Sequence, residues 1–213
     1  MDVRTPVLFL AAVLAILTAG VSPAGASTTL RTDPGGALLS GSTTVRSGAG
    51  GSFTAASQLG AGTCTEAGID FDVQRNSSAT SITGSLTSLT FTSCTGQFTG
   101  TTFASCTLSA DDPFPTVHIT AGVGGGTVTI TDLTVRCSFM SSPSFCYFTA
   151  TTVVGTFQNG PATLRSTNVA FTPTTGTTGL PFLGCGGTGT VWSWDLTDLV
   201  QSTTNRTLTV TTS

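Results

Sequence analysis

Two carboxylates spaced two residues apart are the first candidates for chemistry. Asp70 and Asp72 alternate with apolar side chains in the segment 69–73, which has the period of a β-strand, so both carboxylates share one face. Paired carboxylates could hydrolyse a glycosidic bond. The same pair suits the solvent-exposed face of an edge strand, where charge discourages strand-to-strand aggregation. The sequence favours this second interpretation.

A histidine-based active site has little support. His118 is the only histidine; it lies between Val117 and Ile119, with Asp111 and Asp112 just upstream. A Ser-His-Asp site needs a nucleophile on a strained turn, and the chain has no Gly-x-Ser-x-Gly sequence. The alternation around His118 indicates the solvent face of a strand, so no catalytic residue is expected.

Two tryptophans are the candidates for ligand contact. Trp192 and Trp194 flank Ser193 and therefore point to the same side of a strand. Exposed in a row, the two rings would form a platform for stacking sugars. Buried, they would be two large core residues, each removing about 200 Å² from water. The core interpretation is favoured, because the chain has few large aromatics other than Phe.

No metal or cofactor is expected. Several further acidic residues could bind Ca²⁺ from loops, but their spacing lacks the D-x-D-x-D-G pattern of a calcium loop. The chain also contains no C-x-x-C pair that would indicate a zinc site. These acidic residues are Glu66, Asp111, Asp112, Asp132, Asp195 and Asp198.

The composition argues against polyanionic partners. Charged residues make up 8% of the chain, and no Lys is present among its basic residues, whereas a typical protein has about 25% charged residues. Seven scattered arginines cannot form the basic patch that nucleic acid or an anionic membrane surface requires. The abundant Thr suits the solvent side of β-strands, so the polar surface is neutral.

The pattern of strands predicts an all-β protein, an antiparallel β-sandwich or a barrel. Alternating segments recur about every ten residues between Gly, Asn and Pro, and no helical periodicity follows the first 26 residues. The apolar phase slips by one residue between Ile82 and Phe91 and again between Ile130 and Leu133. Such slips indicate bulges or strands that cross between sheets.

The N-terminus has the organisation of a secretory signal peptide over residues 1–26. Arg4 precedes an apolar run that ends at Ala19, and Ala24-Gly-Ala26 suits signal peptidase. The run is shorter than the ~20 residues of a membrane span. We therefore expect a single secreted domain, 27–213, with no membrane span after cleavage. It contains two weakly similar halves, about 27–122 and 123–213.

An even number of cysteines in an exported chain favours disulfides. If the two halves carry corresponding bridges, the pairs are Cys64–Cys94, Cys106–Cys137 and Cys146–Cys185. The closest rival arrangement uses the short spans Cys94–Cys106 and Cys137–Cys146. The first arrangement is favoured.

The chain resembles a group of exported Thr/Gly-rich proteins from actinobacteria. The residues that carry this resemblance are Gly84-Ser-Leu-Thr-Ser-Leu-Thr-Phe-Thr-Ser-Cys-Thr-Gly96, Cys106-Thr-Leu before Asp112-Pro-Phe-Pro115, and Cys185 ahead of Thr190-Val-Trp-Ser-Trp194. The group has no assigned activity, so the resemblance implies a cell-envelope or secreted location and no site residues.

These observations favour a non-catalytic exported protein that is surface-associated or binds a ligand such as cell-wall glycan. The alternatives are a carboxylate-dependent hydrolase of extracellular polysaccharide and a carrier of a small apolar ligand. A hydrolase needs two carboxylates facing each other across a cleft. A carrier needs an internal cavity of several hundred Å³.

Overall fold

The computed structural model describes residues 27–32, 36, 38–39, 41–48, 50–57, 60–74, 80–98, 101–109, 114–140, 142–174 and 190–212, and these form strands without any helix. The predicted signal peptide lies outside the described residues. The strands are β1 (Thr28–Thr32), β2 (Ser42–Arg46), β3 (Ser52–Ser57), β4 (Gly60–Gln74), β5 (Ile82–Phe98), β6 (Thr101–Leu108), β7 (Thr116–Gly122), β8 (Gly125–Phe139), β9 (Ser142–Gln158), β10 (Thr163–Pro173), β11 (Thr190–Leu196), β12 (Val200–Gln201) and β13 (Leu208–Thr212).

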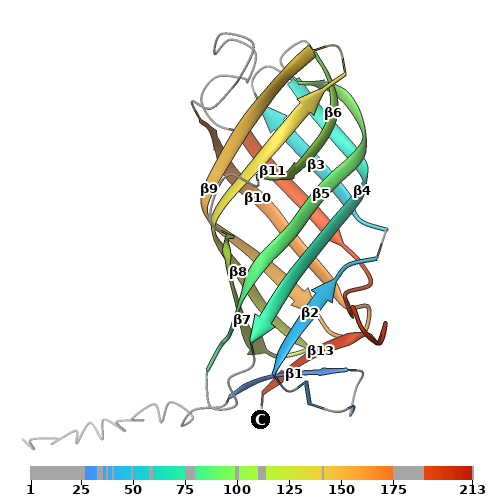
Figure 1. The fold of residues 1–213 in the computed structure, drawn as a ribbon, viewed down its shortest axis with the longest axis vertical. Helices are drawn as coiled ribbons and strands as arrows, with labels where there is room; N and C mark the ends of the chain where they lie inside the picture. Colours follow the sequence, from blue (N-terminus) through green and yellow to red (C-terminus); the bar gives the residue numbers. More distant parts are fainter. Residues whose placement is uncertain are drawn as a thin grey trace, which may run out of the picture.

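Eight antiparallel strands close into a barrel (Figure 1). Around the ring they follow the order β3, β4, β5, β6, β8, β9, β10, β11, and β11 pairs with β3 to complete it. The shorter β7 pairs with both β5 and β8, where it continues the wall beyond β6. The all-β prediction is confirmed, and of its two architectures the barrel is the observed one.

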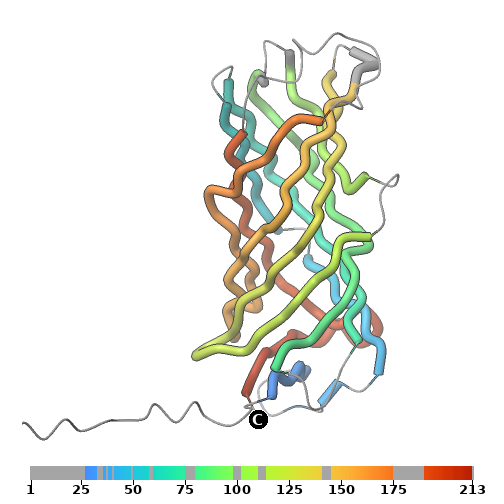
Figure 2. The backbone as a smooth tube through the Cα atoms, turned by 90° about the vertical axis from the view of Figure 1, so that its left-hand side faces the viewer, coloured from blue at the N-terminus to red at the C-terminus, as the bar shows by residue number. Residues whose placement is uncertain are grey.

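The first and last strands form a separate two-stranded sheet across one end of the barrel (Figures 1 and 2). The Thr28 hydroxyl donates to the Thr80 carbonyl at 2.6 Å and accepts from the Ala121 amide at 3.0 Å. The side-chain amide of Asn159 both donates to and accepts from the backbone of Val210, each at 2.8 Å. These hydrogen bonds fix the small sheet against the barrel.

The barrel interior is filled by aromatic rings at the level of β3 and β11. Trp192 stacks on Phe171 with ring centroids 4.0 Å apart and meets the edge of Phe53 at 5.1 Å. Phe53 in turn stacks on Phe91 at 4.1 Å. Because alternate residues of each strand point inward, these rings from strands far apart in sequence meet on the barrel axis.

The first predicted phase slip, between Ile82 and Phe91, is confirmed as a bulge. In β5 the register with β4 shifts at Asp70/Phe71, so Thr87 is passed over and the inward positions change from Leu86 to Leu89. At the second predicted slip Ile130 and Leu133 are both buried and Asp132 has a left-handed φ of 58°, but the register of β8 with β9 does not change there. The bulge in β5 lets that strand keep its apolar side chains inside while the wall bends.

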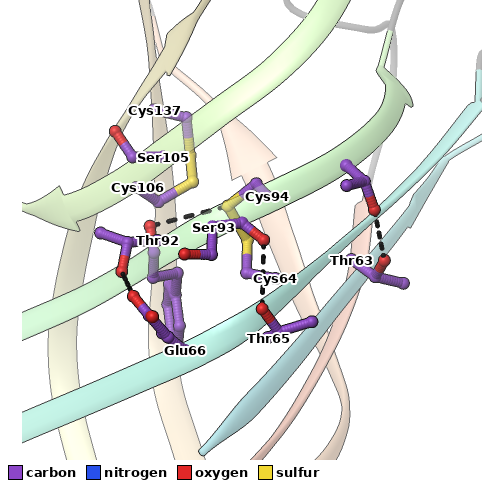
Figure 3. Close-up of a disulfide and its surroundings, with 12 residues drawn as sticks. Thr63, Cys64, Thr65, Glu66, Thr92, Ser93, Cys94, Ser105, Cys106 and Cys137 are labelled. Atoms are coloured by element: carbon purple, nitrogen blue, oxygen red, sulfur yellow. Dashed lines mark hydrogen bonds between the residues drawn. A yellow bond between two sulfur atoms is a disulfide. The ribbon is translucent and has the colours of Figure 1, made fainter. Parts of the chain in front are cut away.

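Two disulfides each join neighbouring strands (Figure 3). Cys64 on β4 bonds Cys94 on β5, and Cys106 on β6 bonds Cys137 on β8, as the favoured arrangement predicted. Cys146 on β9 is also disulfide-bonded, and its predicted partner Cys185 lies outside the described residues. Disulfides of this kind are typical of an oxidising, extracellular environment.

The two predicted halves contribute equally to the ring. β3 to β6 come from the first half and β8 to β11 from the second, so the halves share one barrel and one core. Among the described residues, no helix has the length and apolarity to cross a membrane.

Candidate functional site

A hollow of about 300 Å³ lies on the outer wall of the barrel, over β4 and β5. Its floor is β4 from Glu66 to Asp70, with Gly68 at the middle. One side is formed by outward-facing hydroxyls of β5, and the other by the chain that follows β2. The lining residues are Ser47, Gly48, Glu66, Ala67, Gly68, Ile69, Asp70, Ser88, Thr90 and Thr92.

The hollow exists because β4 changes partner at this point. β3 pairs with β4 from Gly60 to Cys64, and β2 pairs with it from Asp70 to Gln74. Between these two ladders Ser47 makes two hydrogen bonds to the strand: its amide donates to the Ile69 carbonyl, and its hydroxyl accepts from the Ile69 amide, both at 2.9 Å. Between its two successive partner strands, this edge of β4 therefore has no paired strand beside the hollow.

Gly68 deepens the hollow, and the backbone does not require a glycine there. A Cβ at this position would approach the Thr90 hydroxyl oxygen at 3.0 Å and the Ser47 hydroxyl oxygen at 3.9 Å, both at the ends of side chains. At Gly84, by contrast, a Cβ would lie 2.1 Å from the Asp72 carbonyl oxygen, so the fold forbids a side chain. A glycine inside a strand costs stability, and at position 68 no backbone contact explains it.

The hollow presents several polar groups that have no hydrogen-bond partner among the described residues. The Thr92 hydroxyl donates to Oε2 of Glu66 at 2.8 Å (Figure 3), which leaves the other carboxylate oxygen of Glu66 open. Within the described part of the chain, the hydroxyls of Ser88 and Thr90 and the carboxylate of Asp70 make no hydrogen bond. These groups can accept and, through the hydroxyls, donate hydrogen bonds to a ligand.

Burial raises the pKa of Asp70 above its ordinary value. The positive charge of Arg46, which is opposite Asp70 on β2, opposes this shift, and the carboxylate of Asp72 reinforces it. Arg46 hydrogen-bonds the side chain of Asn205, and Asp72 accepts a hydrogen bond from the Thr44 hydroxyl. Of these three charged side chains, Asp70 is the one without a hydrogen-bond partner among the described residues, and it is half-buried.

The edge-strand interpretation of Asp70 and Asp72 is wrong. β4 has β5 on one side and β3 and then β2 on the other, so it is an interior strand of the wall. The two carboxylates do share the outer face, as predicted, but they divide in role. Asp72 is bonded to Thr44, while Asp70 lines the hollow.

Trp192 and Trp194 do not form an outer platform for a ligand. Their exposed fractions are 1% and 3%, because the inward positions of β11 place both rings in the aromatic core. The possible ligand contact at these residues is corrected in favour of the core interpretation. Neither indole N–H has a hydrogen-bond partner among the described residues.

The remaining acidic residues and the histidine lie apart from one another. His118 stands between Thr83 and Thr129 on neighbouring strands, Asp132 has a left-handed backbone within β8, and Asp195 forms an ion pair with Arg165 at 2.5 Å. In the described ranges, no three His, Cys, Asp or Glu side chains converge to hold a metal ion. Asp111 and Asp112 lie outside the described residues.

Reasoning from sequence found one residue of the hollow's polar set, Asp70, and missed its neighbours. Glu66 was considered only as a calcium ligand, and Ser88, Thr90 and Thr92 were indistinguishable from other outward hydroxyls. One signal was available. Gly68 occupies an outward position within the alternating segment, and a glycine inside a strand pattern indicates a bulge or a close approach.

Comparison with known proteins finds no matching family model, no matching curated protein and no matching solved structure.

Proposed function

We propose that this protein is an exported, non-catalytic β-barrel that binds a hydroxyl-rich ligand, a cell-surface glycan, in the hollow at Gly68. The observation that carries the proposal is a hollow in which several polar groups have no protein partner among the described residues, around a glycine that the backbone does not need. A glycine in this strand lowers stability without a structural reason, as is common at positions where function determines the residue.

The chemistry of the lining suits sugars. Each sugar hydroxyl both donates and accepts a hydrogen bond, and the lining offers hydroxyls that do both, at Ser88 and Thr90, beside carboxylates that accept. The open, shallow shape fits a polymer lying along the wall better than a small molecule that must be enclosed.

The arrangement favours binding over hydrolysis. Glu66 and Asp70 are four residues apart on one strand, so their Cα atoms are about 13 Å apart. Both carboxylates rise from the same floor, whereas a glycosidase places its two carboxylates on either side of the scissile bond. Release of new reducing ends from a bound polysaccharide would support the hydrolase alternative.

The aromatic core argues against the apolar carrier. Phe53, Phe91, Phe171 and Trp192 occupy the axis of the barrel with centroid spacings of 4.0 to 5.1 Å. A ligand at this level would have to displace rings that are almost fully buried.

Export rests on the signal-like N-terminus together with the disulfides. Of the described residues, Cys64, Cys94, Cys106 and Cys137 are bonded in pairs, which suits an oxidising compartment.

A pull-down with insoluble cell-wall polysaccharide tests the function. The mature chain is compared with Gly68→Val, which fills the hollow, and with Ala170→Val, which places the same valine side chain on the exposed outer face of β10. We expect retention of the wild type and of Ala170→Val, and at least tenfold weaker retention of Gly68→Val. No retention of the wild type, or equal retention of Gly68→Val, would overturn the proposal.

A further inference from the structure

The charges in the hollow all have one sign. Its only charged lining groups are Glu66 and Asp70, and the side that β5 supplies is neutral, with Ser88, Thr90 and Thr92. The nearest cation to Asp70 is Arg46 on β2, whose guanidinium is engaged by Asn205. Of the described residues around the hollow, none therefore supplies a positive charge inside it.

We infer that the glycan bound in the hollow carries free amino groups, as a polymer of glucosamine does. This inference rests on the proposed function and specifies its ligand. A protonated amine brings donors and a positive charge to carboxylates that can only accept. A uronic acid would bring a third negative charge to the same place.

The two carboxylates are placed to act on different parts of one polymer. With Cα atoms about 13 Å apart along β4, Glu66 and Asp70 stand at opposite ends of the hollow, with Gly68 between them. An amine on one sugar can reach Asp70, and an amine further along the chain can reach Glu66. The hydroxyls of Ser88 and Thr90 are then left for the sugar hydroxyls between the amines.

Hydrogen bonds to charged partners are stronger than those between neutral groups by about tenfold in affinity. We expect the preference for the amino sugar over its neutral form to weaken as salt is added, because both carboxylates are partly exposed and ions screen them. It should also weaken as the pH falls and Asp70 takes up a proton. The charged groups that face Asp70 are Arg46 from β2 and Asp72 from its own strand, so these two neighbours influence the pH at which binding weakens.

Calorimetry on the mature protein with three hexasaccharides separates the outcomes. The probes are the hexamers of glucosamine, of N-acetylglucosamine and of galacturonic acid, at pH 6 and at low and moderate salt. We expect the glucosamine hexamer to bind about tenfold more tightly than its acetylated form, and the galacturonic hexamer not to bind.

Variants assign the preference to the two carboxylates. Asp70→Asn and Glu66→Gln should each bring the glucosamine hexamer towards the affinity of the acetylated one, while Gly68→Val should abolish binding of both. Ala170→Val serves as the control.

Each contrary result has a separate meaning. Equal affinities for the glucosamine and N-acetylglucosamine hexamers, both lost in Gly68→Val, would overturn the amino-group inference and leave the proposed function standing. Binding that Gly68→Val does not change would overturn both, since the charge effect would then come from elsewhere on the surface. Absence of binding by all three hexamers would overturn the inference as well.

Discussion

Removal of the Cys64–Cys94 bridge should destabilise the barrel by an amount that its loop length sets. The double variant Cys64→Ala/Cys94→Ala opens a loop with a sequence separation of 30 residues. Restricting such a loop in the unfolded chain is worth about 3.6 kcal/mol at 25 °C. Both cysteines are also buried, and each lost sulfur costs on the order of 1 kcal/mol in packing.

The expected loss in the free energy of unfolding is therefore about 5 kcal/mol. For a domain of this size that corresponds to a fall in Tm of roughly 10–20 °C. Urea titration followed by circular dichroism measures both the loss and its origin. The slope of unfolding free energy against urea should rise, because the unfolded chain without the bridge exposes more surface.

The second bridge provides a matched control. Cys106–Cys137 closes a loop with a separation of 31 residues, so the corresponding double alanine variant should lose a similar amount. A loss below about 2 kcal/mol for Cys64→Ala/Cys94→Ala, with an unchanged urea slope, would refute the unfolded-state argument.

Three further predictions concern the core, the end sheet and the hollow. Because Trp192 and Trp194 are buried, their fluorescence should resist quenching by iodide in the native protein, and strong quenching would place them at the surface. Asn159→Asp puts a carboxylate against the Val210 carbonyl, which raises the pKa of the new carboxyl in the folded state. The variant should be less stable than the wild type by about 2 kcal/mol at neutral pH. This deficit should shrink as the pH falls, because the protonated carboxyl can donate a hydrogen bond to the carbonyl as the amide does. A deficit independent of pH would contradict that reasoning. The pKa of Asp70 is raised in the folded state, so its ionisation at neutral pH opposes folding; Asp70→Asn should raise the urea midpoint at pH 7, and the gain should vanish below about pH 3.8. A lower midpoint at pH 7 would mean that attraction to Arg46 outweighs the burial.

The local pattern of the sequence was enough to predict which side chains point inward. Ile69, Phe71 and Val73 alternate with polar residues and are all buried, because a strand places successive side chains on opposite faces. The phase slip near Thr87 was predictable for the same reason, since a bulge is the local way to keep apolar residues on one side.

The closure of the barrel could not be read in this way. It depends on the pairing of β11 with β3, whose residues are far apart in the chain, and alternation is the same in a sandwich and in a barrel. For the same reason the sequence could favour burial of Trp192 and Trp194 but could not establish it. Only the ring of strands brings Phe53 and Phe171 against Trp192, and those contacts make the core interpretation the correct one.

The hollow shows most clearly which features the sequence determines and which depend on the tertiary structure. By itself the sequence determined that Asp70 and Asp72 share a face. Only the tertiary structure decided that β3 leaves β4 before β2 joins it, and that outward hydroxyls of β5 border the uncovered stretch. Alternation is a property of one strand, whereas a hollow depends on where neighbouring strands end, and long-range pairing sets those ends.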